Sequence, residues 1–161
     1  LLEYLAEYRR SLPVEFDQPQ CANHAVDVVV RYYLQQAKEA GAELDIKLDV
    51  PVGAGFRDTD LVIVFGNLFE NAAQGISRQT AGKRYITARC GMEQGKLILT
   101  IDNSTGPGDA EYKSSTGLGI GQSSVKAVAQ KYHGSVRFEF KEDIYKASVL
   151  MVMPVSEKVQ E

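Results

Sequence analysis

The sequence is poor in the residues that would place it in several large classes of protein. Among its 161 residues there are only 2 cysteines, Cys21 and Cys90, and they lie too far apart for a metal-binding or disulfide spacing. This cysteine usage indicates reduced thiols in a cytosolic domain. The sequence also contains no internal repeats and no low-complexity tracts.

An excess of basic residues and a long apolar run are absent as well. The formal net charge is −3 and the sequence pI is about 5.5, so nothing indicates a nucleic-acid partner. No apolar run approaches the roughly 20 residues that a membrane helix needs. The first residues, Leu1–Pro13, are amphipathic and charged, so we expect no signal peptide among them. Because the chain starts without Met, inside a helical pattern, we expect it to be excised from a longer protein.

What remains is typical of one globular domain, because 44% of the residues are hydrophobic and 24% are charged. Helices between antiparallel hairpins favour an α+β fold, a two-layer sandwich in which helices cover one face of a mixed sheet. The predicted strands lie at 14–16, 43–50, 84–90, 96–101, 136–140 and 147–153. The predicted helices lie at 1–11, from Pro19 or Asn23 to Ala40, from a cap at Asp58 or Thr59 to Arg78, and at 123–133.

The helix expected over Leu61–Ile76 carries a polar stripe on an otherwise apolar surface. Asn67, Glu70, Asn71 and Gln74 recur at spacings of three and four, so they share one face. An unpaired buried polar group costs about 1–3 kcal/mol. This cost favours a stripe that faces a cavity with ligand, water or metal over a polar edge that faces water. Amide and carboxylate oxygens also suit Mg²⁺.

Asp102 is a second candidate, because a predicted strand runs directly into it. The segment Leu97–Gly108 reads LILTIDNSTGPG. An acidic side chain at a strand end, followed by a glycine-containing loop, can fix a ligand amino group by hydrogen bonding. The alternative is an Asx-turn that only turns the chain. Residues 102–116 are rich in Gly, Ser, Thr and Pro, which is typical of a mobile loop.

Alternating glycines stand directly before the last helix, in the segment Gly117–Gly134 (GLGIGQSSVKAVAQKYHG). A glycine-rich turn at a helix start can bind phosphate, because unpaired N–H groups and the positive dipole end point toward it. A Walker A loop would need Lys after the last glycine, and a dinucleotide-binding turn would need a preceding apolar strand, so both are excluded. A tight turn with close helix packing is the alternative without a ligand.

Together and in this order, the three motifs resemble the ATP-binding domain of the GHKL, or Bergerat-fold, ATPases. This superfamily includes sensor histidine kinases, DNA gyrase, heat-shock chaperones and the mismatch-repair protein MutL. The stretch GNLFENAAQGI resembles the N box, IDNSTG the G1 box and STGLGIGQSS the G2 box. The form of the boxes is most similar to the histidine kinases, and among them to the quorum- and peptide-sensing branch. The resemblance covers roughly residues 14–154.

The resemblance implies a role for each residue of these motifs. Asn71 would coordinate Mg²⁺ that bridges the ATP phosphates, and Glu70 would act as the general base for the accepting group. Asp102 would accept a hydrogen bond from the adenine amino group. Lys113 would reach the phosphates or remain a solvated surface lysine. The other implied ATP contacts are Asn67 and Gln74 on the phosphate side, Gly106 beside the adenine, and the phosphate-wrapping turn of Gly117, Leu118, Gly119, Ile120 and Gly121.

The sequence departs from the family pattern in two places. The G1 box usually reads Asp-x-Gly-x-Gly, and Ser104 replaces its first glycine, which implies an altered loop geometry rather than lost binding. A histidine kinase also needs a phosphoacceptor histidine. His24 lacks an acidic neighbour at the next position, and His133 closes the last predicted helix, where it would lie near the negative dipole end. The acceptor is therefore expected before residue 1.

The resemblance thus implies the catalytic domain of a sensor histidine kinase with ATP and Mg²⁺ as ligands. It would transfer the γ-phosphoryl group to a histidine on an absent dimerisation domain, and a response regulator would act downstream. Residues 1–13 would be the tail of the dimerisation helix, 14–154 the catalytic domain and 155–161 a disordered tail. The loop 105–116 would be a lid that orders on nucleotide. The expected setting is the cytoplasmic side of a bacterial, membrane-bound homodimer.

Three other functions are compatible with the same motifs. An anti-sigma-factor-type serine kinase would phosphorylate a partner protein. A non-catalytic module would use nucleotide only to control partner contacts. An ATPase similar to gyrase or MutL would use Glu70 to activate water, although such proteins generally carry longer lids.

Overall fold

The computed structural model describes residues 1–10, 19–50, 52–106 and 120–155, except for the side chains of residues 8–10 and 120. The predicted strand at 14–16, most of the predicted lid and nearly all of the 155–161 tail lie outside these ranges. The described elements are α1 (Leu2–Arg10), α2 (His24–Glu39), β1 (Glu43–Leu48), α3 (Asp58–Arg78), β2 (Tyr85–Glu93), β3 (Lys96–Ser104), α5 (Ile120–Lys131), β4 (Ser135–Lys141) and β5 (Ile144–Val152).

The strands form one mixed sheet of five strands in the order β1-β2-β3-β5-β4. Strand β1 pairs with β2 in parallel, whereas β2, β3, β5 and β4 pair in antiparallel fashion. The parallel pair requires a crossover, and α3 provides it. The sheet places the ends of β3 and β5 side by side, with Asn103 opposite Tyr145.

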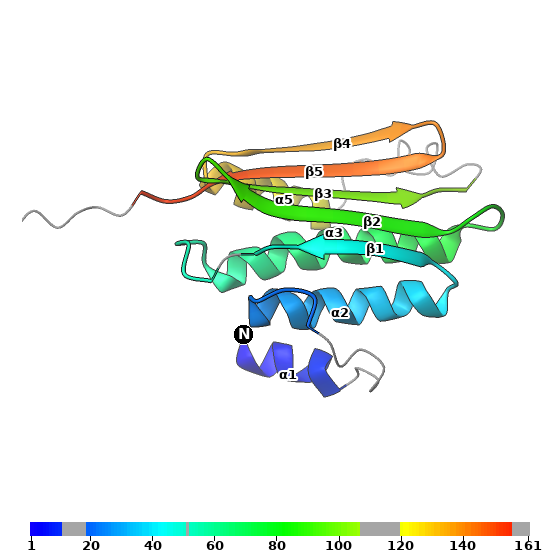
Figure 1. The fold of residues 1–161 in the computed structure, drawn as a ribbon, viewed down its shortest axis with the longest axis horizontal. Coiled ribbons are helices and arrows are strands. Elements are labelled where there is room, and N and C mark those ends of the chain that lie inside the picture. The colour runs from blue at the N-terminus through cyan, green and yellow to red at the C-terminus, as the bar shows by residue number, and fades with distance from the viewer. Residues whose placement is uncertain (11–18, 51, 107–119, 156–161) are drawn as a thin grey trace, which may run out of the picture.

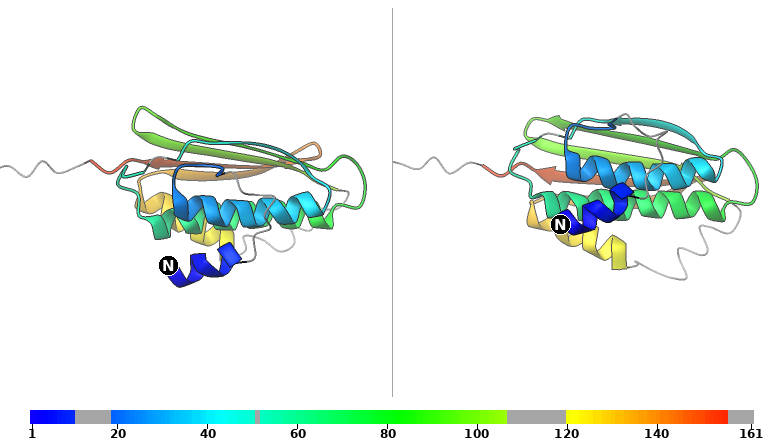
Figure 2. Two further views of the ribbon diagram at one scale, coloured as in Figure 1. Left: turned by 60° about the horizontal axis from the view of Figure 1, so that its bottom comes forward. Right: turned by 90° about the horizontal axis from the view of Figure 1, so that it is seen from below.

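The helices lie together on one face of the sheet (Figures 1 and 2). Helix α3 packs against α2 on one side and α5 on the other, and α1 lies farther from the sheet, beyond α2 and α3 (Figure 2). This arrangement confirms the predicted α+β, two-layer sandwich with helices on one face of a mixed sheet. No helix in the described part of the chain is both long and apolar enough to span a membrane.

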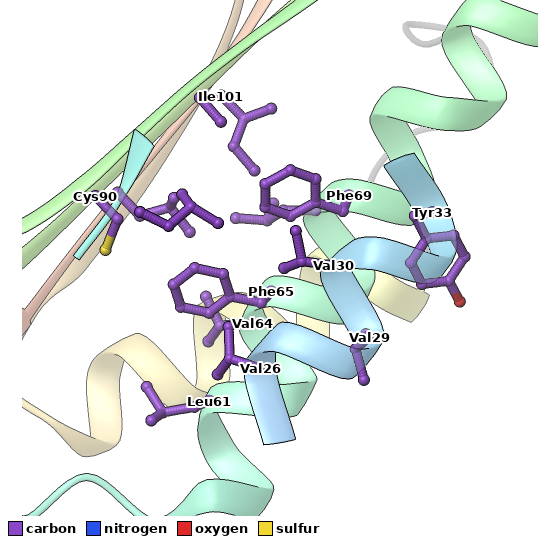
Figure 3. Packing of buried hydrophobic residues seen from close by; sticks show 14 of the residues in the cluster. Val26, Val29, Val30, Tyr33, Leu61, Val64, Phe65, Phe69, Cys90 and Ile101 are labelled. Carbon is purple, nitrogen blue, oxygen red and sulfur yellow. The ribbon is translucent and has the colours of Figure 1, made fainter. Parts of the chain in front are cut away.

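The core fills the space between α2, α3 and the sheet (Figure 3). Phe65 and Phe69 of α3 are fully buried and stack with ring centroids 6.4 Å apart. Val30 of α2 and Ile101 of β3 lie next to them (Figure 3). Burial of each such side chain contributes roughly 1.5–3 kcal/mol, so this cluster fixes the position of α3 on the sheet.

The starts of two helices differ from the prediction. Asn23 caps α2 as predicted, because its side chain accepts a hydrogen bond from the Val26 amide. Helix α3, however, has Arg57 at its N-cap and no side-chain cap bond. The carboxylate of Asp58 instead accepts a hydrogen bond from Asn23 Nδ2 at 3.3 Å. Helix α5 begins at Ile120, three residues before the predicted start, because its first turn accommodates a glycine despite the low helix propensity of glycine.

The C-terminal end of α5 also differs from the prediction. The helix ends at Lys131, and His133 has a φ of 53° and leaves the helix in a left-handed conformation. The amide of Gly134 then donates to the carbonyl oxygen of Ala129 at 2.8 Å. His133 therefore terminates the helix rather than belonging to its last turn.

Candidate functional site

The polar stripe of α3 lies at the boundary between the core and the surface. The phenylalanines of α3 point toward the sheet (Figure 3). On the rest of the helix surface, Asn67, Glu70 and Asn71 are half-buried and Gln74 is exposed. The stripe is thus not enclosed within the core.

Asn67 holds α3 against the first turn of α5. Its Nδ2 donates a hydrogen bond to the carbonyl oxygen of Ile63 at 2.7 Å. The Oδ1 atom of the same side chain lies so close to Gly121 that an added Cβ there would stand 2.6 Å from it. A larger residue at position 121 would displace Asn67 from this bond, so the close approach requires glycine. The N–H groups and the positive dipole end of α5 are thereby kept beside the stripe.

Asn71 makes a hydrogen bond to the side chain of Tyr145 in β5. The Nε2 atom of Gln122, in the first turn of α5, donates to the same hydroxyl at 2.6 Å. One phenolic oxygen therefore joins α3, α5 and β5. The N-box and G2-box segments meet at this point, as the resemblance implies.

Asp102 lies on the face of the sheet that the helices do not cover. In β3 the buried side chains alternate with half-buried ones, and Asp102 belongs to the half-buried set. Its Oδ2 forms an ion pair at 3.2 Å with Nζ of Lys146, which stands opposite it on β5. This corrects the expectation that Asp102 stands in the pocket at the end of its strand. The strand continues to Ser104, and the structure does not bring Asp102 to the other site residues.

Asn103 is the polar side chain of β3 that faces α3. It is 3% exposed, and an added Cβ at Gly75 would stand 2.8 Å from its Nδ2. The same Nδ2 donates to the carbonyl oxygen of Ser104 at 2.9 Å. Asn103 also lies directly opposite Tyr145 on the neighbouring strand. A hydrogen-bonding amide thus occupies the place predicted for the Asp102 carboxylate.

The residues that follow Asn103 are tied to the end of α3. The Ser104 hydroxyl accepts a hydrogen bond from the Tyr85 amide at 3.0 Å and donates one to Gln79 Oε1 at 2.7 Å. Gly106 packs on the same residue, since an added Cβ would lie 3.4 Å from Cα of Gln79. Ser104 therefore replaces the usual glycine of the G1 box with an anchoring hydroxyl.

Glu70 and Gln74 border cavities that α1 and α2 also line. Glu70 lines a cavity of about 510 Å³ and a second of about 360 Å³, and Tyr4 and Tyr33 line both of them. Gln74 lines the larger cavity, and its Nε2 lies 3.5 Å from Glu70 Oε1. Asn67 lines the smaller cavity together with Glu70, so these two side chains border one space, whereas Asn71 reaches Tyr145.

Several predicted site residues lie outside the described part of the chain. Ile120 is the first residue of α5, and its side chain is not described. The remaining ones are Lys113, Gly117, Leu118 and Gly119.

The donor set of the described residues fits a divalent cation that is bound together with an anion. Among these residues no group of three or more His, Cys, Asp or Glu side chains comes together, so they form no all-protein cage. Mg²⁺ in proteins typically takes one or two protein oxygens and keeps water and phosphate oxygens. The amide of Asn71 supplies such an oxygen. The first turn of α5 carries no acidic residue that would repel an anion at the helix N-terminus.

The sequence patterns could have identified Asn103 but not Tyr145. Leu97, Leu99 and Ile101 are buried at every second position of β3. Continuing this alternation by one step predicts that Asn103, rather than Asp102, is the next buried residue. Tyr145 carries no such signal, because an apolar partner strand accommodates a tyrosine at any inward position. Its role depends on the packing of α5, which only the structure shows.

Comparison with known proteins gives one family and a set of similar folds. The family model described as GHKL domain matches residues 57–152. A search of curated proteins gives no match to the sequence.

Three solved structures share the fold. The catalytic domain of histidine kinase ThkA superposes with a TM-score of 0.59 at 17% identity, covering 81% of this chain and 92% of that chain. The Acinetobacter baumannii histidine kinase AdeS gives 0.55 at 21% identity, covering 96% and 79%. The histidine kinase domain of the Erythrobacter litoralis EL346 blue-light-activated kinase gives 0.54 at 13% identity, covering 80% and 65%.

Proposed function

This chain belongs to the GHKL domain family, and on that premise we propose that it is the catalytic domain of a sensor histidine kinase. The observation that carries the proposal is the meeting of α3, α5 and β5 at one hydroxyl, with Asn71 and Gln122 as its partners. The similarity of the fold to histidine kinase catalytic domains supports it.

ATP would bind where α3, α5 and β5 meet, with its adenine at one end of this region and its phosphates at the other. Asn103, buried beside Gly75, offers an amide that can both donate to and accept from an adenine edge. The phosphates would lie at the N-terminus of α5, near Gly121 and Asn67. Lys113, Gly117, Leu118 and Gly119 remain proposed phosphate contacts.

Mg²⁺ would be held by Asn71 and would neutralise charge on the phosphate oxygens during transfer. The protein's own contribution is to position the groups, because phosphoryl transfer requires little covalent chemistry from the enzyme. Asn71 contributes a fixed amide, and the first turn of α5 contributes N–H groups that need no reorganisation.

Glu70 would act as the general base beside Asn67, with which it lines one cavity. Its carboxylate lines the cavities beside α1, where it can receive the ring proton of an approaching histidine. The phosphorus–oxygen bond to ADP then breaks as the phosphorus–nitrogen bond to the imidazole forms. Residues 14–154 would form this catalytic domain and 1–13 the tail of a dimerisation helix, with the acceptor before residue 1. A response regulator and a membrane-bound homodimer complete the proposal.

Calorimetric titration with Mg·ATP tests the binding site. Asn71→Ala should weaken ATP binding at least tenfold in the presence of Mg²⁺. The matched control is Gln130→Ala, which removes an exposed amide farther along α5 and should bind as the wild type does. Equal affinities in the wild type and Asn71→Ala would contradict the assignment.

Transfer is tested with γ-labelled ATP on the chain extended to its natural N-terminus. Label that is lost in acid and retained in base supports phosphohistidine. Acid-stable label would instead support the serine-kinase alternative. Intact ATP binding without any label on protein would support the non-catalytic module, and rapid release of free phosphate would support an ATPase.

A further inference from the structure

A chain of buried polar side chains connects the end of α3 with Asn103, the residue proposed to meet the adenine. Gln79, Asn103 and Ser104 are each 3% exposed. Buried polar groups are nearly always hydrogen-bonded, because an unpaired one costs free energy. These three side chains are linked through one another and through the nearby backbone. Gln79 lies beyond the N box and belongs to none of the three motifs, so the resemblance gives it no role.

The side-chain amide of Gln79 has one possible orientation. Its Nε2 donates to the carbonyl oxygens of Ala81 at 2.9 Å and Lys83 at 3.1 Å. Carbonyl oxygens only accept hydrogen bonds, so the nitrogen must lie beside them and Oε1 must lie on the other side. There Oε1 accepts the hydroxyl proton of Ser104 at 2.7 Å. The Ser104 oxygen in turn accepts from the Tyr85 amide at 3.0 Å, so its position is fixed by two bonds.

The peptide group between Ser104 and Thr105 is held at both of its polar atoms. Its N–H group donates to the carbonyl oxygen of Asp143 at 3.0 Å. Its carbonyl oxygen accepts from Asn103 Nδ2 at 2.9 Å. Turning the Asn103 amide over would place Oδ1 against this carbonyl oxygen, and two acceptors repel each other. The amide of Asn103 therefore keeps Nδ2 on the Ser104 side and Oδ1 on the opposite side.

Helix α3 adds a steric limit on the nitrogen side of the same amide. An added Cβ at Gly75 would stand 2.8 Å from Asn103 Nδ2. An amide that is held in this way recognises fewer nucleobases than a free one. A free asparagine can present its oxygen to an amino group or its nitrogen to a carbonyl group. Asn103 can offer only Oδ1 at its free end, which attracts an amino group and repels a carbonyl oxygen.

We propose that Ser104 and Gln79 are positioning residues for the nucleobase. They hold the Asn103 amide with Oδ1 toward the base, and so make the site selective for a 6-aminopurine nucleotide over a 6-oxopurine nucleotide. Neither side chain needs to contact the nucleotide. The serine that replaces the usual glycine of the G1 box thereby contributes to base selectivity. The inference rests on the proposed function, since it refines the base contact of the proposed ATP site.

The test is calorimetric titration of Ser104→Ala with ATP and with ITP, in which an oxygen replaces the 6-amino group. The wild type should bind ATP about tenfold or more tightly than ITP, which corresponds to one good hydrogen bond. In Ser104→Ala the amide can turn over, so ATP affinity should fall, ITP affinity should rise, and their ratio should fall about tenfold. Gln79→Leu should act in the same direction. General damage to the fold cannot raise the affinity for ITP.

The matched control is Asn23→Ala, which removes a buried amide at the opposite end of α3. Asn23 is 5% exposed, and its partners are the Val26 amide and the carboxylate of Asp58, the first residue of α3. Asn23→Ala should lower the stability and leave the ATP-to-ITP ratio unchanged. Both nucleotides are titrated on one preparation, so unfolded protein cancels in the ratio. A changed ratio in this control would overturn the inference.

A double variant shows whether Ser104 acts through Asn103. Asn103→Ala alone should bring the ratio close to one, and adding Ser104→Ala should change it no further. Preference for ATP that survives Asn103→Ala would overturn the inference. So would equal affinities of the wild type for the two nucleotides, or equal weakening of both in Ser104→Ala. If the wild type binds neither nucleotide, the proposed function fails; if it prefers ATP and Ser104→Ala keeps the same ratio, only this inference fails.

Discussion

At the scale of single residues, two neighbours on β3 have opposite surroundings. Asp102 forms an ion pair with Lys146 on the open face of the sheet, whereas Asn103 is buried against Gly75 under α3. Successive side chains of a strand point to opposite faces, so an assignment that is off by one residue changes the face completely.

Asn103→Ala should weaken ATP binding about tenfold, which corresponds to about 1.4 kcal/mol and to the loss of one good hydrogen bond. Asp102→Ala should change ATP affinity by less than about twofold, because its carboxylate faces away from α3. Calorimetric titration of both variants checks the pair. The reverse ranking would return the adenine contact to Asp102.

At the scale of elements, α3 contacts both the beginning of α5 and the end of α5. At one end Asn67 lies against Gly121. At the other end Asp60, which is 7% exposed, accepts hydrogen bonds from Lys131 Nζ at 2.8 Å and from the Tyr132 hydroxyl at 2.6 Å. The second cluster lies outside the proposed site, so it holds the helices in register without contacting nucleotide.

Acid should weaken the Asp60 cluster. Burial alone raises the pKa of Asp60, but hydrogen bonds from Lys131 and Tyr132 outweigh it and lower the pKa below its ordinary 3.8. A depressed carboxyl pKa contributes stability above the unfolded value and loses it as the pH falls through the folded value. The difference in unfolding free energy between wild type and Asp60→Asn should therefore be constant near neutral pH and shrink below about pH 4.

Urea unfolding at a series of pH values measures that difference. Asp45→Asn is the comparison, since Asp45 also has a lowered pKa but its pair with Arg89 is exposed. Added salt should reduce the effect of the exposed pair more than that of Asp60. A difference for Asp60→Asn that grows on acidification would refute the role of its carboxylate.

The turn between α5 and β4 depends on Gly134. An added Cβ at this position would overlap the carbonyl oxygen of Leu150, which is backbone and cannot rotate away. Gly134→Ala should lower the free energy of unfolding by about 3 kcal/mol, at the upper end of overpacking effects. Gly91→Ala is the matched control, because nothing lies within 4 Å of an added Cβ there. It should be neutral or stabilise by up to about 1 kcal/mol, and chemical unfolding of the two variants distinguishes them.

The whole molecule shows what could be predicted from the sequence and what could not. The α+β class, the strands and the long N-box helix followed from periodicity, because burial of one face imposes a spacing on the residues. The end of the strand at Asp102 was mispredicted, because its glycine-rich surroundings suggested a strand that ends at residue 101, three residues before the observed end at Ser104. The start of α5 was missed because Gly121 is a poor helix former, yet contact with Asn67 stabilises it there.

Nucleotide should stabilise the molecule as a unit. Mg·ATP at 100 times its dissociation constant adds about 2.7 kcal/mol to the unfolding free energy. For a domain of this size that corresponds to a rise in melting temperature of about 5–11 °C. A thermal melt with and without Mg·ATP measures the shift, and Asn71→Ala should abolish most of it. An equal shift in Asn71→Ala would place the ligand elsewhere.

The two flanks of α3 have a kinetic consequence. Asn71 reaches β5 and α5 on one flank, while Glu70 opens onto α1 and α2 on the other. On the proposed function, nucleotide and phosphoacceptor enter by different routes and meet beside Asn67, which lines a cavity together with Glu70. The two substrates can then arrive in either order before the imidazole nitrogen contacts the γ-phosphorus directly, as in-line transfer requires.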